Sequence, residues 1–247
     1  MNSSLSSESS FVTFSVVSHG QGNLIHSLLQ DMRNWVGVKF EIILTQNISE
    51  DNAYLEGFRD LDIFLIINDV PKGFGANHNA AFAKAKGDFF VVLNPDIRAS
   101  KLDLDPLVTA AKSQGIGACA PVVMSVEGKI EDSARRYPTL LRFFKRTFLK
   151  KRSVDYEFTS KLVKVDWIAG MFMVFRREVF KSIGGFDERY YMYLEDADIC
   201  RRINRCGLDV VVINESSVIH DARRASRRNL QHILWHYRSA FRFLFGF

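Results

Sequence analysis

Cysteine is scarce in this chain, and its spacing shows no pairing. The 247 residues contain three cysteines, Cys119, Cys200 and Cys206, and none belongs to a Cys-x-x-Cys pair. An odd number without that spacing indicates neither a disulfide framework nor a zinc site. A reducing cytosol is the simplest setting for such a composition.

Long hydrophobic runs and a leader segment are also missing. No apolar stretch approaches the roughly 18 residues that span a bilayer, so any contact with a membrane is expected at its surface. The first ten residues are rich in serine and contain no basic residue, which is unlike a signal peptide. We predict that residues 1–10 form a disordered tail.

Charge of neither sign dominates the sequence. The 33 Lys and Arg residues exceed the 28 Asp and Glu residues, giving a formal net charge of +5. This excess suits an anionic partner such as a nucleotide, a nucleic acid or an anionic membrane, without choosing among them. The length allows one large α/β domain or two small domains.

The most informative stretch covers residues 88–97, Asp-Phe-Phe-Val-Val-Leu-Asn-Pro-Asp-Ile. Its unbroken apolar run predicts a central strand that is covered on both faces. Pro95 cannot donate to a strand ladder, so the strand ends there and Asp96 lies on a turn at its carboxyl end. Open α/β sheets bind ligands at that edge, so Asp96 is either a solvated loop residue or a metal ligand.

Strands and helices alternate along the chain. Apolar periodicity predicts strands at residues 11–17, 41–45, 64–68, 88–94, 117–125 and 209–214, and helices at residues 24–32, 76–86, 105–114, 176–183 and from about 196 to 206. Asn23 is expected to cap the first helix, and Gly87 to end the second. The alternation predicts an α/β protein with a doubly wound, mostly parallel sheet.

A glycine loop precedes the second helix. Gly73-Phe74-Gly75 would supply backbone N–H groups and the positive end of a helix, which together favour phosphate. The loop lacks the lysine and hydroxyl residue of a P-loop and the third glycine of a dinucleotide fingerprint. Taken alone, its glycines are explained equally well by a tight turn.

Two further groups carry candidate chemistry. Glu195, Asp196 and Asp198 lie at a helix start, where acidic residues are commonly favoured by the helix dipole alone. The functional alternative is that one carboxylate is a general base for a substrate hydroxyl. His220 follows an apolar strand, and by itself is more often a packed or surface residue. With Asp96 it could complete an oxygen and nitrogen site for Mn²⁺ or Mg²⁺.

The order of these features favours one kind of reaction. A metal carboxylate after a central strand, a glycine loop before it, an acidic helix start and a terminal histidine are the groups needed to bind a nucleotide diphosphate with a metal. A hydroxyl nucleophile then displaces the nucleotide from a sugar.

These residues resemble glycosyltransferase family two, the inverting enzymes with a GT-A fold, over most of residues 11–220. The matching motifs are Val17-Ser18-His19-Gly20, Lys72-Gly73-Phe74-Gly75-Ala76-Asn77-His78-Asn79, Leu93-Asn94-Pro95-Asp96, Val165-Asp166-Trp167-Ile168-Ala169-Gly170, Gly185-Phe186-Asp187-Glu188, Met192-Tyr193-Leu194-Glu195-Asp196 and Val218-Ile219-His220. The Ser-His-Gly start, the Asn-Pro-Asp variant of Asp-x-Asp and the basic aromatic tail resemble the bacterial O-antigen rhamnosyltransferases. The resemblance implies a doubly wound sheet with a smaller antiparallel part on the acceptor side.

The resemblance also implies roles for individual residues. Asp196 matches the catalytic base, Asp96 the metal ligand and His220 the position that completes the metal site, with Mg²⁺ or Mn²⁺ as cofactor. The donor-binding positions are Ser18, His19, Gln46, Gly73, Phe74, Asn77, Asn79, Asn94 and Asp96, and those at the acceptor are Trp167, Ala169, Gly170 and Glu195. Gln46 stands where many relatives carry Asp against the nucleobase, which leaves a UDP- or GDP-sugar as an alternative donor.

The implied partners are dTDP-L-rhamnose and a polyprenyl-diphosphate-linked glycan acceptor, in the synthesis of O-antigen or another surface polysaccharide. We expect a catalytic domain at residues 11–220 and a basic amphipathic helical segment at 221–247, which would hold the enzyme peripherally at the cytoplasmic face of the plasma membrane. Packing of that segment on the domain, or a homodimer contact, explains its apolar stripe equally well.

Two other classes fit the sequence less well. A sugar nucleotidyltransferase should have a glycine-rich and basic triphosphate loop near its start, whereas residues 18–22 are Ser-His-Gly-Gln-Gly. A nucleic-acid-binding module should have a basic stripe with stacking aromatics in place of acidic residues at strand ends. We therefore expect no nucleic-acid partner.

Overall fold

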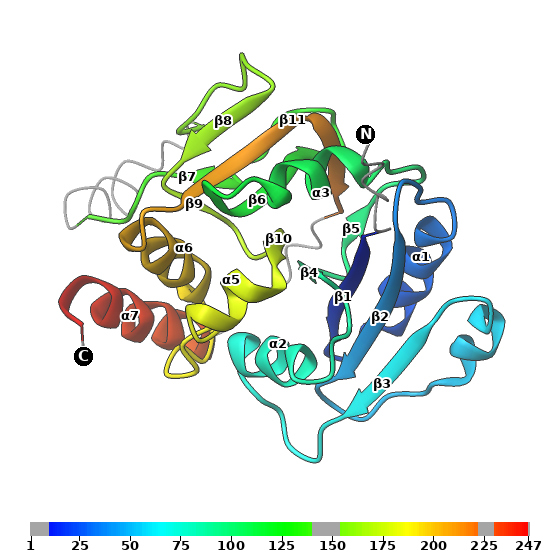
Figure 1. Ribbon diagram of the computed structural model, residues 1–247. Coiled ribbons are helices and arrows are strands. Elements are labelled where there is room, and N and C mark those ends of the chain that lie inside the picture. Colours follow the sequence, from blue (N-terminus) through cyan, green and yellow to red (C-terminus); the bar gives the residue numbers. More distant parts are fainter. Residues whose placement is uncertain (1–9, 140–153, 222–229, 247) are drawn as a thin grey trace, which may run out of the picture.

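The computed structural model describes residues 10–139, 154–221 and 230–246 (Figure 1). Residues 1–9 of the predicted disordered tail lie outside the described residues. So does the first part of the C-terminal segment, residues 222–229.

Within these ranges a nine-stranded sheet forms the centre of the molecule, with the order β3-β2-β1-β4-β10-β6-β11-β5 and with β8 paired to β11. A separate two-stranded sheet contains β7 and β9. The strands are β1 (Phe11–Ser18), β2 (Lys39–Gln46), β3 (Ile63–Ile67), β4 (Phe89–Leu93), β5 (Ile97–Arg98), β6 (Ile116–Ser125), β7 (Ala134–Arg135), β8 (Leu162–Val165), β9 (Trp167–Ile168), β10 (Phe172–Arg176) and β11 (Asp209–His220).

The N-terminal half of the sheet is parallel. Strand β1 pairs in parallel with β2 on one side and β4 on the other, and β2 pairs in parallel with β3. All five residues of β4 are buried, which confirms the fully covered central strand that its unbroken apolar run predicted. Parallel pairing places the carboxyl ends of β1, β2, β3 and β4 at one edge of the sheet.

The other half mixes directions. Strand β10 runs antiparallel to both β4 and β6, whereas β11 is parallel to β6 and antiparallel to β5 and β8. A register shift between Ile213 and Ser217 lets β11 continue to His220. The predicted strand ended at residue 214, because Asn214 and Glu215 interrupt the apolar run. The longer strand carries His220 to the edge strand β5, where His220 pairs with Ile97.

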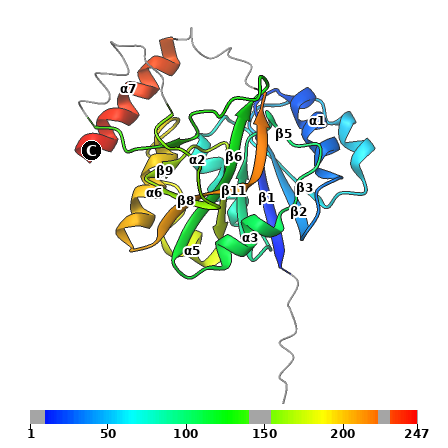
Figure 2. The same ribbon diagram turned by 90° about the horizontal axis from the view of Figure 1, so that it is seen from above.

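Helices cover both faces of the sheet, and each face has its own hydrophobic core (Figures 1 and 2). Helices α1 (Gly22–Met32) and α3 (Asp105–Lys112) pack with one core. The other core contains residues of α2 (Phe74–Phe82), α5 (Arg177–Ser182), α6 (Glu195–Arg205) and α7 (Leu230–Phe245). A 3₁₀ helix, η1 (Ala53–Phe58), follows β2. The doubly wound α/β arrangement is the predicted one.

Two predicted helix boundaries are wrong. Gln21, not Asn23, is the N-cap of α1, because the helix already begins at Gly22. Helix α2 begins at Phe74 and ends at Phe82, before the alanine-rich residues that were expected to extend it to Lys86. The backbone N–H of Gly87 instead donates to the Thr13 hydroxyl at 2.8 Å, which ties this turn to β1.

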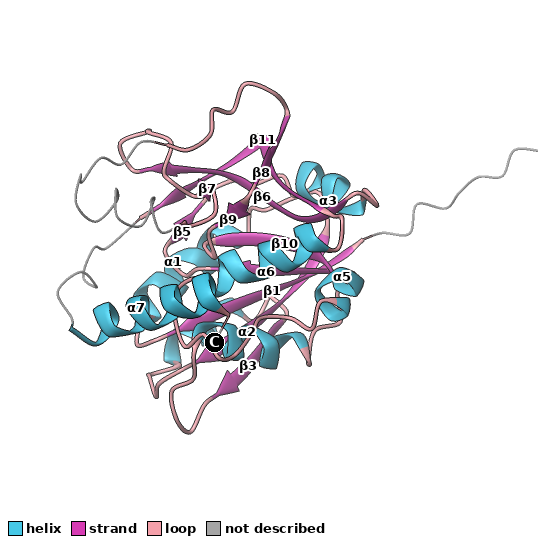
Figure 3. Cartoon of the chain, turned by 90° about the vertical axis from the view of Figure 1, so that its left-hand side faces the viewer, coloured by secondary structure: helices cyan, strands magenta, loops and turns pink. Residues whose placement is uncertain are grey.

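Helix α7 lies outside α6 (Figure 3). It packs against the 190–194 loop through side chains that include His232 and Trp235. Its Ala240 and Phe243 are buried, and the Ser239 hydroxyl donates to the Met192 carbonyl at 2.8 Å. Packing on the domain, one of the three expectations for this segment, is therefore observed over residues 230–245. In the described part of the chain, no helix combines the length and the apolarity needed to cross a bilayer.

Candidate active site

The donor side of the candidate site begins with a network of three asparagines at the carboxyl edge of the sheet. Asn47 and Asn68 directly follow β2 and β3, and Asn68 donates to the side-chain oxygens of Asn47 at 2.9 Å and of Asn77, on α2, at 2.7 Å. Asn47 also accepts from the Lys72 N–H at 2.8 Å and donates to the Lys72 carbonyl at 2.9 Å. The network fixes the loop that enters α2 against two strand ends.

The predicted donor residues Asn77 and Asn79 have partners within the protein. Asn77 is buried and donates to the carbonyls of Lys72 and Gly73 at 3.2 and 3.0 Å. Asn79 donates to the Phe186 carbonyl at 2.9 Å and accepts from the Phe186 N–H at 2.9 Å. In this structure both amides hold α2 in place. Direct contact with a nucleotide remains a prediction.

The predicted donor residues at the ends of β1 and β2 lie next to each other. Ser18 is opposite Gln46 in the strand register, and its hydroxyl accepts from the Gln21 N–H at 3.1 Å. The amide of Gln46 donates to Asn52, and the His19 ring is 3.3 Å from the Asn47 amide. The structure brings these side chains together at the strand ends where the resemblance places the nucleotide.

An unexpected carboxylate lies on the same side. Both carboxylate oxygens of Glu50 are buried and have no hydrogen-bond partner among the described residues. Burial and the Glu50 charge raise the pKa of Tyr54 to about 12. Both side chains lie against Gly22, where an added Cβ would be 3.2 Å from the Tyr54 ring and 3.7 Å from Glu50. An acidic group is thus present four residues after Gln46, the position at which the resemblance implies contact with the nucleobase.

The glycine loop makes a close contact with the acceptor side of the site. The Phe74 N–H donates to the Tyr191 carbonyl at 2.9 Å. A Cβ on Gly73 would lie 2.6 Å from that oxygen, and one on Gly75 would lie 2.7 Å from the Phe186 Cβ. The two glycines therefore serve close backbone approach, and one N–H group that was considered for phosphate is already bound within the protein.

Asp96 and His220 meet at the edge of the sheet, as the resemblance implied. The His220 Nε2 lies 3.1 Å from the Asp96 Oδ2, and its Nδ1 lies 2.7 Å from the Glu131 Oε2. Burial alone would lower the pKa of His220, but the two carboxylates outweigh it and raise the pKa to about 9. Glu131 was not singled out from the sequence, because no motif surrounds it.

The Asp96 and His220 pair fits a divalent cation that is shared with a substrate. The Asp96 Oδ1 is buried and has no hydrogen-bond partner in the described part of the chain. No group of three or more His, Cys, Asp or Glu side chains among the described residues could hold a metal ion alone. Mg²⁺ sites in phosphate chemistry often use one or two carboxylates and complete their coordination with substrate phosphates. The Asp96 carboxylate and a neutral His220 imidazole would therefore hold such an ion only together with a diphosphate.

Asp196 lies where three of the resembling motifs meet. Its Oδ2 accepts from the Gly170 N–H at 3.0 Å, and its Oδ1 accepts from the Ala197 N–H at 2.8 Å. Gly170 in turn is covered by the Phe74 ring, which would be 2.9 Å from an added Cβ. The carboxylate is thus oriented by the N–H of its neighbour Ala197 and by the N–H of Gly170, which lies on a segment distant in sequence.

Glu195 and Asp196 form a pair of neighbouring carboxyl groups in an apolar setting. Burial raises the pKa of Asp196, and burial together with the Asp196 charge raises the pKa of Glu195 well above its usual range. Glu195 is 5% exposed, and its Oε2 has no partner in the described residues. A carboxylate whose pKa is raised is a better proton acceptor at neutral pH.

The backbone before this pair is strained. Tyr193 and Leu194 both have positive φ, 72° and 64°, and they are the two non-glycine residues with positive φ among those described. Such conformations cost of order 1–3 kcal/mol each and persist only where the surroundings impose them. Here the Tyr193 hydroxyl lies 2.8 Å from the His232 ring of α7. The left-handed conformation of these two residues sets the direction in which α6 begins, and so the position of Asp196.

Three of the predicted acceptor residues lie on the segment of β9 and the turn after it, and Gly170 of this segment contacts Asp196. Trp167 is buried, and its indole N–H donates to the Arg136 carbonyl at 3.2 Å. The Ala169 N–H donates to the Ser133 carbonyl at 2.7 Å. Together with the contact from Gly170, these bonds fix the segment that adjoins the carboxylate.

Comparison with known proteins identifies the family. Residues 14–184 match the model of glycosyl transferase family 2, and residues 152–225 match that of the N-terminal domain of galactosyltransferase. The chain is 31% identical over 245 residues to rhamnosyltransferase WbbL of Escherichia coli, covering 93% of this chain and 90% of that protein. The chain belongs to glycosyltransferase family 2. It is therefore a glycosyltransferase, as its motifs predicted.

A second relative is similar to a smaller part of this chain. N-acetylglucosaminyl-diphospho-decaprenol L-rhamnosyltransferase of Mycobacterium tuberculosis is 31% identical over 168 residues, which is 64% of this chain and 55% of that protein. The matched part of this chain thus spans about half the length of that relative.

Solved structures confirm the GT-A fold. GalNAc-T7 with UDP, GalNAc and Mn²⁺ superposes with a TM-score of 0.66 at 17% identity, covering 88% of this chain and 45% of that one. The mannosyltransferase PcManGT of Pyrobaculum calidifontis with GDP-Man and Mn²⁺ has a TM-score of 0.61 at 19% identity, covering 94% and 64%.

Gly73→Ala tests the close contact between the glycine loop and the Tyr191 carbonyl. The added Cβ cannot fit against the Tyr191 carbonyl, so we expect the free energy of unfolding to fall by about 1–3 kcal/mol. The midpoint of thermal unfolding should fall by roughly 2–4 °C for each kcal/mol. Gly57→Ala is the control, because an added Cβ there meets nothing within 4 Å. Equal midpoints for the two variants would show that the contact is not tight in solution.

Proposed function

We propose that this enzyme transfers L-rhamnose from dTDP-L-rhamnose, with inversion, to a hydroxyl of a polyprenyl-diphosphate-linked glycan in surface polysaccharide synthesis. The observation that carries the proposal is the 31% identity to an Escherichia coli rhamnosyltransferase over 93% of the chain. The mycobacterial relative supports a lipid-linked acceptor, because its name describes rhamnosyl transfer to an N-acetylglucosaminyl-diphospho-lipid.

In this mechanism Asp196 is the general base. Its Oδ2 and Oδ1 are held by the N–H groups of Gly170 and Ala197, so the carboxylate does not rotate freely. It removes the proton of the acceptor hydroxyl as the oxygen attacks the anomeric carbon from the side opposite the nucleotide. Burial raises the pKa of Asp196, which strengthens it as a base.

The diphosphate leaves from the side of Asp96. A divalent cation held there by Asp96 and His220 would supply positive charge to the diphosphate oxygens. Glu131 orients His220 through its Nδ1. Because the leaving group is stabilised as an anion, the reaction does not need the second, acidic carboxyl group that glycoside hydrolases use.

The donor is tested by thermal stabilisation with a panel of nucleotide sugars in Mn²⁺ or Mg²⁺. A ligand at 100 times its Kd stabilises by about 2.7 kcal/mol, which corresponds to a shift of roughly 5–10 °C. We expect dTDP-L-rhamnose to give the largest shift and EDTA to reduce it. A larger shift with a UDP- or GDP-sugar would contradict the rhamnose assignment and leave the transferase assignment intact.

A pair of variants tests the metal ligand in the same assay. Asp96→Ala should lose the metal-dependent part of the shift, whereas Asp62→Ala, an exposed aspartate before β3, should keep it. If Asp96→Ala responds to metal and EDTA as the wild type does, Asp96 is not the ligand.

Asp196→Asn should abolish transfer while donor binding is retained. The amide cannot accept the proton, so kcat should fall by about 10²–10⁴-fold, the usual contribution of a general base. Release of dTDP measures kcat, and the donor-induced thermal shift measures binding. The control is Asp62→Asn, which should turn over like the wild type. An Asp196→Asn variant with near-normal kcat would exclude Asp196 as the base.

We further propose that α7 holds the enzyme on the cytoplasmic membrane surface. The helix buries one face on the domain, yet leaves large apolar side chains exposed, including Leu234 at 67% and Phe241 at 56%. Residues 221–247 contain six Arg on the sequence, which suits anionic lipids.

Flotation with anionic liposomes tests this surface. Leu234→Ser combined with Phe241→Ser should reduce the bound fraction severalfold, because both side chains belong to the exposed apolar stripe. Phe64→Ser combined with Val126→Ser is the control, since these residues are 50% and 63% exposed elsewhere on the molecule. An equal loss in both double variants, or no loss in either, would contradict the membrane role of α7.

A further inference from the structure

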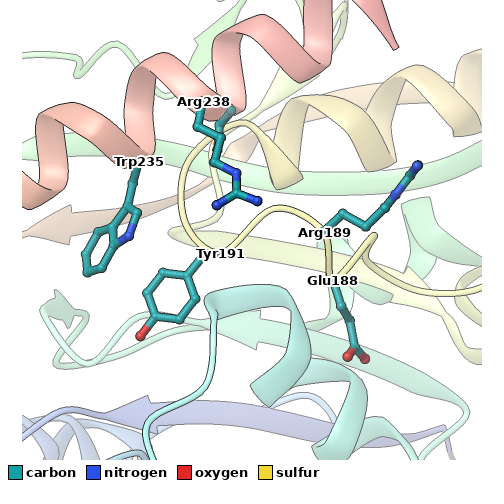
Figure 4. Close-up of a pocket in the computed structure, with 6 residues that line it drawn as sticks. Glu188, Arg189, Tyr191, Trp235 and Arg238 are labelled. Carbon is teal, nitrogen blue, oxygen red and sulfur yellow. The ribbon is translucent and has the colours of Figure 1, made fainter. Parts of the chain in front are cut away.

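A pocket lies between α7 and the loop that precedes α6 (Figure 4). Its volume is about 350 Å³, within the range of roughly 300–1,000 Å³ that is usual for small-molecule sites. The residues that line it are Glu188, Arg189, Tyr191, Trp235, Arg238 and Ser239. Trp235, Arg238 and Ser239 come from α7, which lies outside the residues matched by the family models.

The aromatic part of the pocket comes from two distant segments. The rings of Tyr191 and Trp235 are 4.6 Å apart between centroids at an angle of 41°. Tyr191 is 37% exposed, and Trp235 is only partly buried, so the rings keep accessible apolar surface beside the pocket. Aromatic side chains of this kind offer a flat apolar face together with a polar group at the edge. A sugar ring, which has an apolar C–H face and a rim of hydroxyls, matches that combination.

The charged part of the pocket has one cation without an acidic partner. Arg189 is held by both oxygens of Asp187, and Glu188 accepts from the Asn79 amide at 3.0 Å. Arg238 forms no ion pair with any described residue, and its guanidinium extends from α7 toward the loop (Figure 4). An arginine in this position is suited to bidentate binding of a phosphate group.

The pocket shares a wall with the catalytic site. The Tyr191 carbonyl accepts from the Phe74 N–H of the glycine loop, and the next residue, Met192, accepts from the Ser239 hydroxyl of α7. The same loop continues through the strained Tyr193 and Leu194 to Asp196. A ligand bound between α7 and this loop therefore lies on the segment that positions the base.

We propose that this pocket binds the sugar phosphate portion of the acceptor, with the sugar ring on Tyr191 and Trp235 and a phosphate on Arg238. The inference rests on the proposed function, in which the acceptor is a lipid-linked diphospho-sugar. The exposed apolar face of α7 lies on the same helix. A bilayer contacting that face would bring the phosphates of an embedded acceptor close to Arg238.

Direct binding tests the pocket without requiring turnover. The probe is a soluble short-chain alkyl-diphospho-N-acetylglucosamine, titrated calorimetrically into the full-length protein. We expect Trp235→Ala and Arg238→Gln each to raise the Kd at least tenfold. Arg205→Gln, at an exposed arginine on α6, should leave the Kd unchanged. Thermal unfolding and donor binding close to those of the wild type would show that each variant is folded.

Two simpler probes separate the parts of the pocket. Free N-acetylglucosamine should depend on Trp235 and not on Arg238, whereas an alkyl diphosphate without sugar should depend on Arg238 and not on Trp235. Failure of the wild type to bind the full probe, or an unchanged Kd in both variants, would overturn the proposal.

The same phosphate chemistry occurs in lipid headgroups, so flotation on acceptor-free anionic vesicles forms a further arm. Retained flotation of Arg238→Gln supports acceptor binding, whereas reduced flotation with an unchanged probe Kd would overturn it in favour of headgroup binding. The proposed function fails on a different result, the absence of rhamnosyl transfer by the wild type, which leaves the measured Kd values interpretable.

Discussion

The close backbone contact between the glycine loop and the 186–194 loop is the constraint on which the candidate active site depends. The Phe74 N–H donates to the Tyr191 carbonyl, and neither Gly73 nor Gly75 leaves space for a Cβ. This contact joins the start of α2, on the donor side, to the loop that leads into α6 and Asp196, on the acceptor side. The Phe74 ring then covers Gly170, whose N–H holds the Asp196 carboxylate. Phe74 thus links the donor loop to the 190–194 loop through its backbone N–H, and to the segment that holds the base through its ring.

The strained residues before α6 show how this arrangement is maintained. Left-handed conformations at Tyr193 and Leu194 are unfavourable in isolation, so surrounding contacts must compensate for them. Helix α7 supplies several, through His232, Trp235 and Ser239. Helix α7 therefore stabilises the 190–194 loop, and it is also a candidate membrane contact. The buried apolar face of the helix packs on the domain, and its exposed apolar face is the one that we propose contacts the membrane.

The electrostatics of the two ends of the site differ in kind. At the donor end, His220 lies between two carboxylates, and its pKa is raised. At the acceptor end, two carboxyl groups share an apolar setting, and the pKa values of both are raised. The Asp96 carboxylate and the His220 imidazole, once it has lost its proton, suit binding a cation together with a diphosphate. The paired carboxyl groups suit accepting a proton. The two groups are separated because Asp96 and His220 follow or end strands of the sheet, whereas Glu195 and Asp196 begin helix α6.

The pattern of the sequence was enough to predict strands β1, β2, β3, β4 and β6, the first part of β11, and the burial of β4. The resemblance to the family added the joint position of Asp96 and His220. These features depend on local periodicity and on motifs that the family shares, so they are readable along the chain. Three contacts are visible only in the folded structure. Glu131 contacts His220, and Asn47 and Asn68 form a network with Asn77. Helix α7 packs on the 190–194 loop. Each is a contact between residues far apart in sequence, and no local pattern specifies such a contact. The glycine loop shows the difference most clearly: its sequence suggested phosphate binding or a tight turn, and the structure shows that its glycines admit the backbone of another loop.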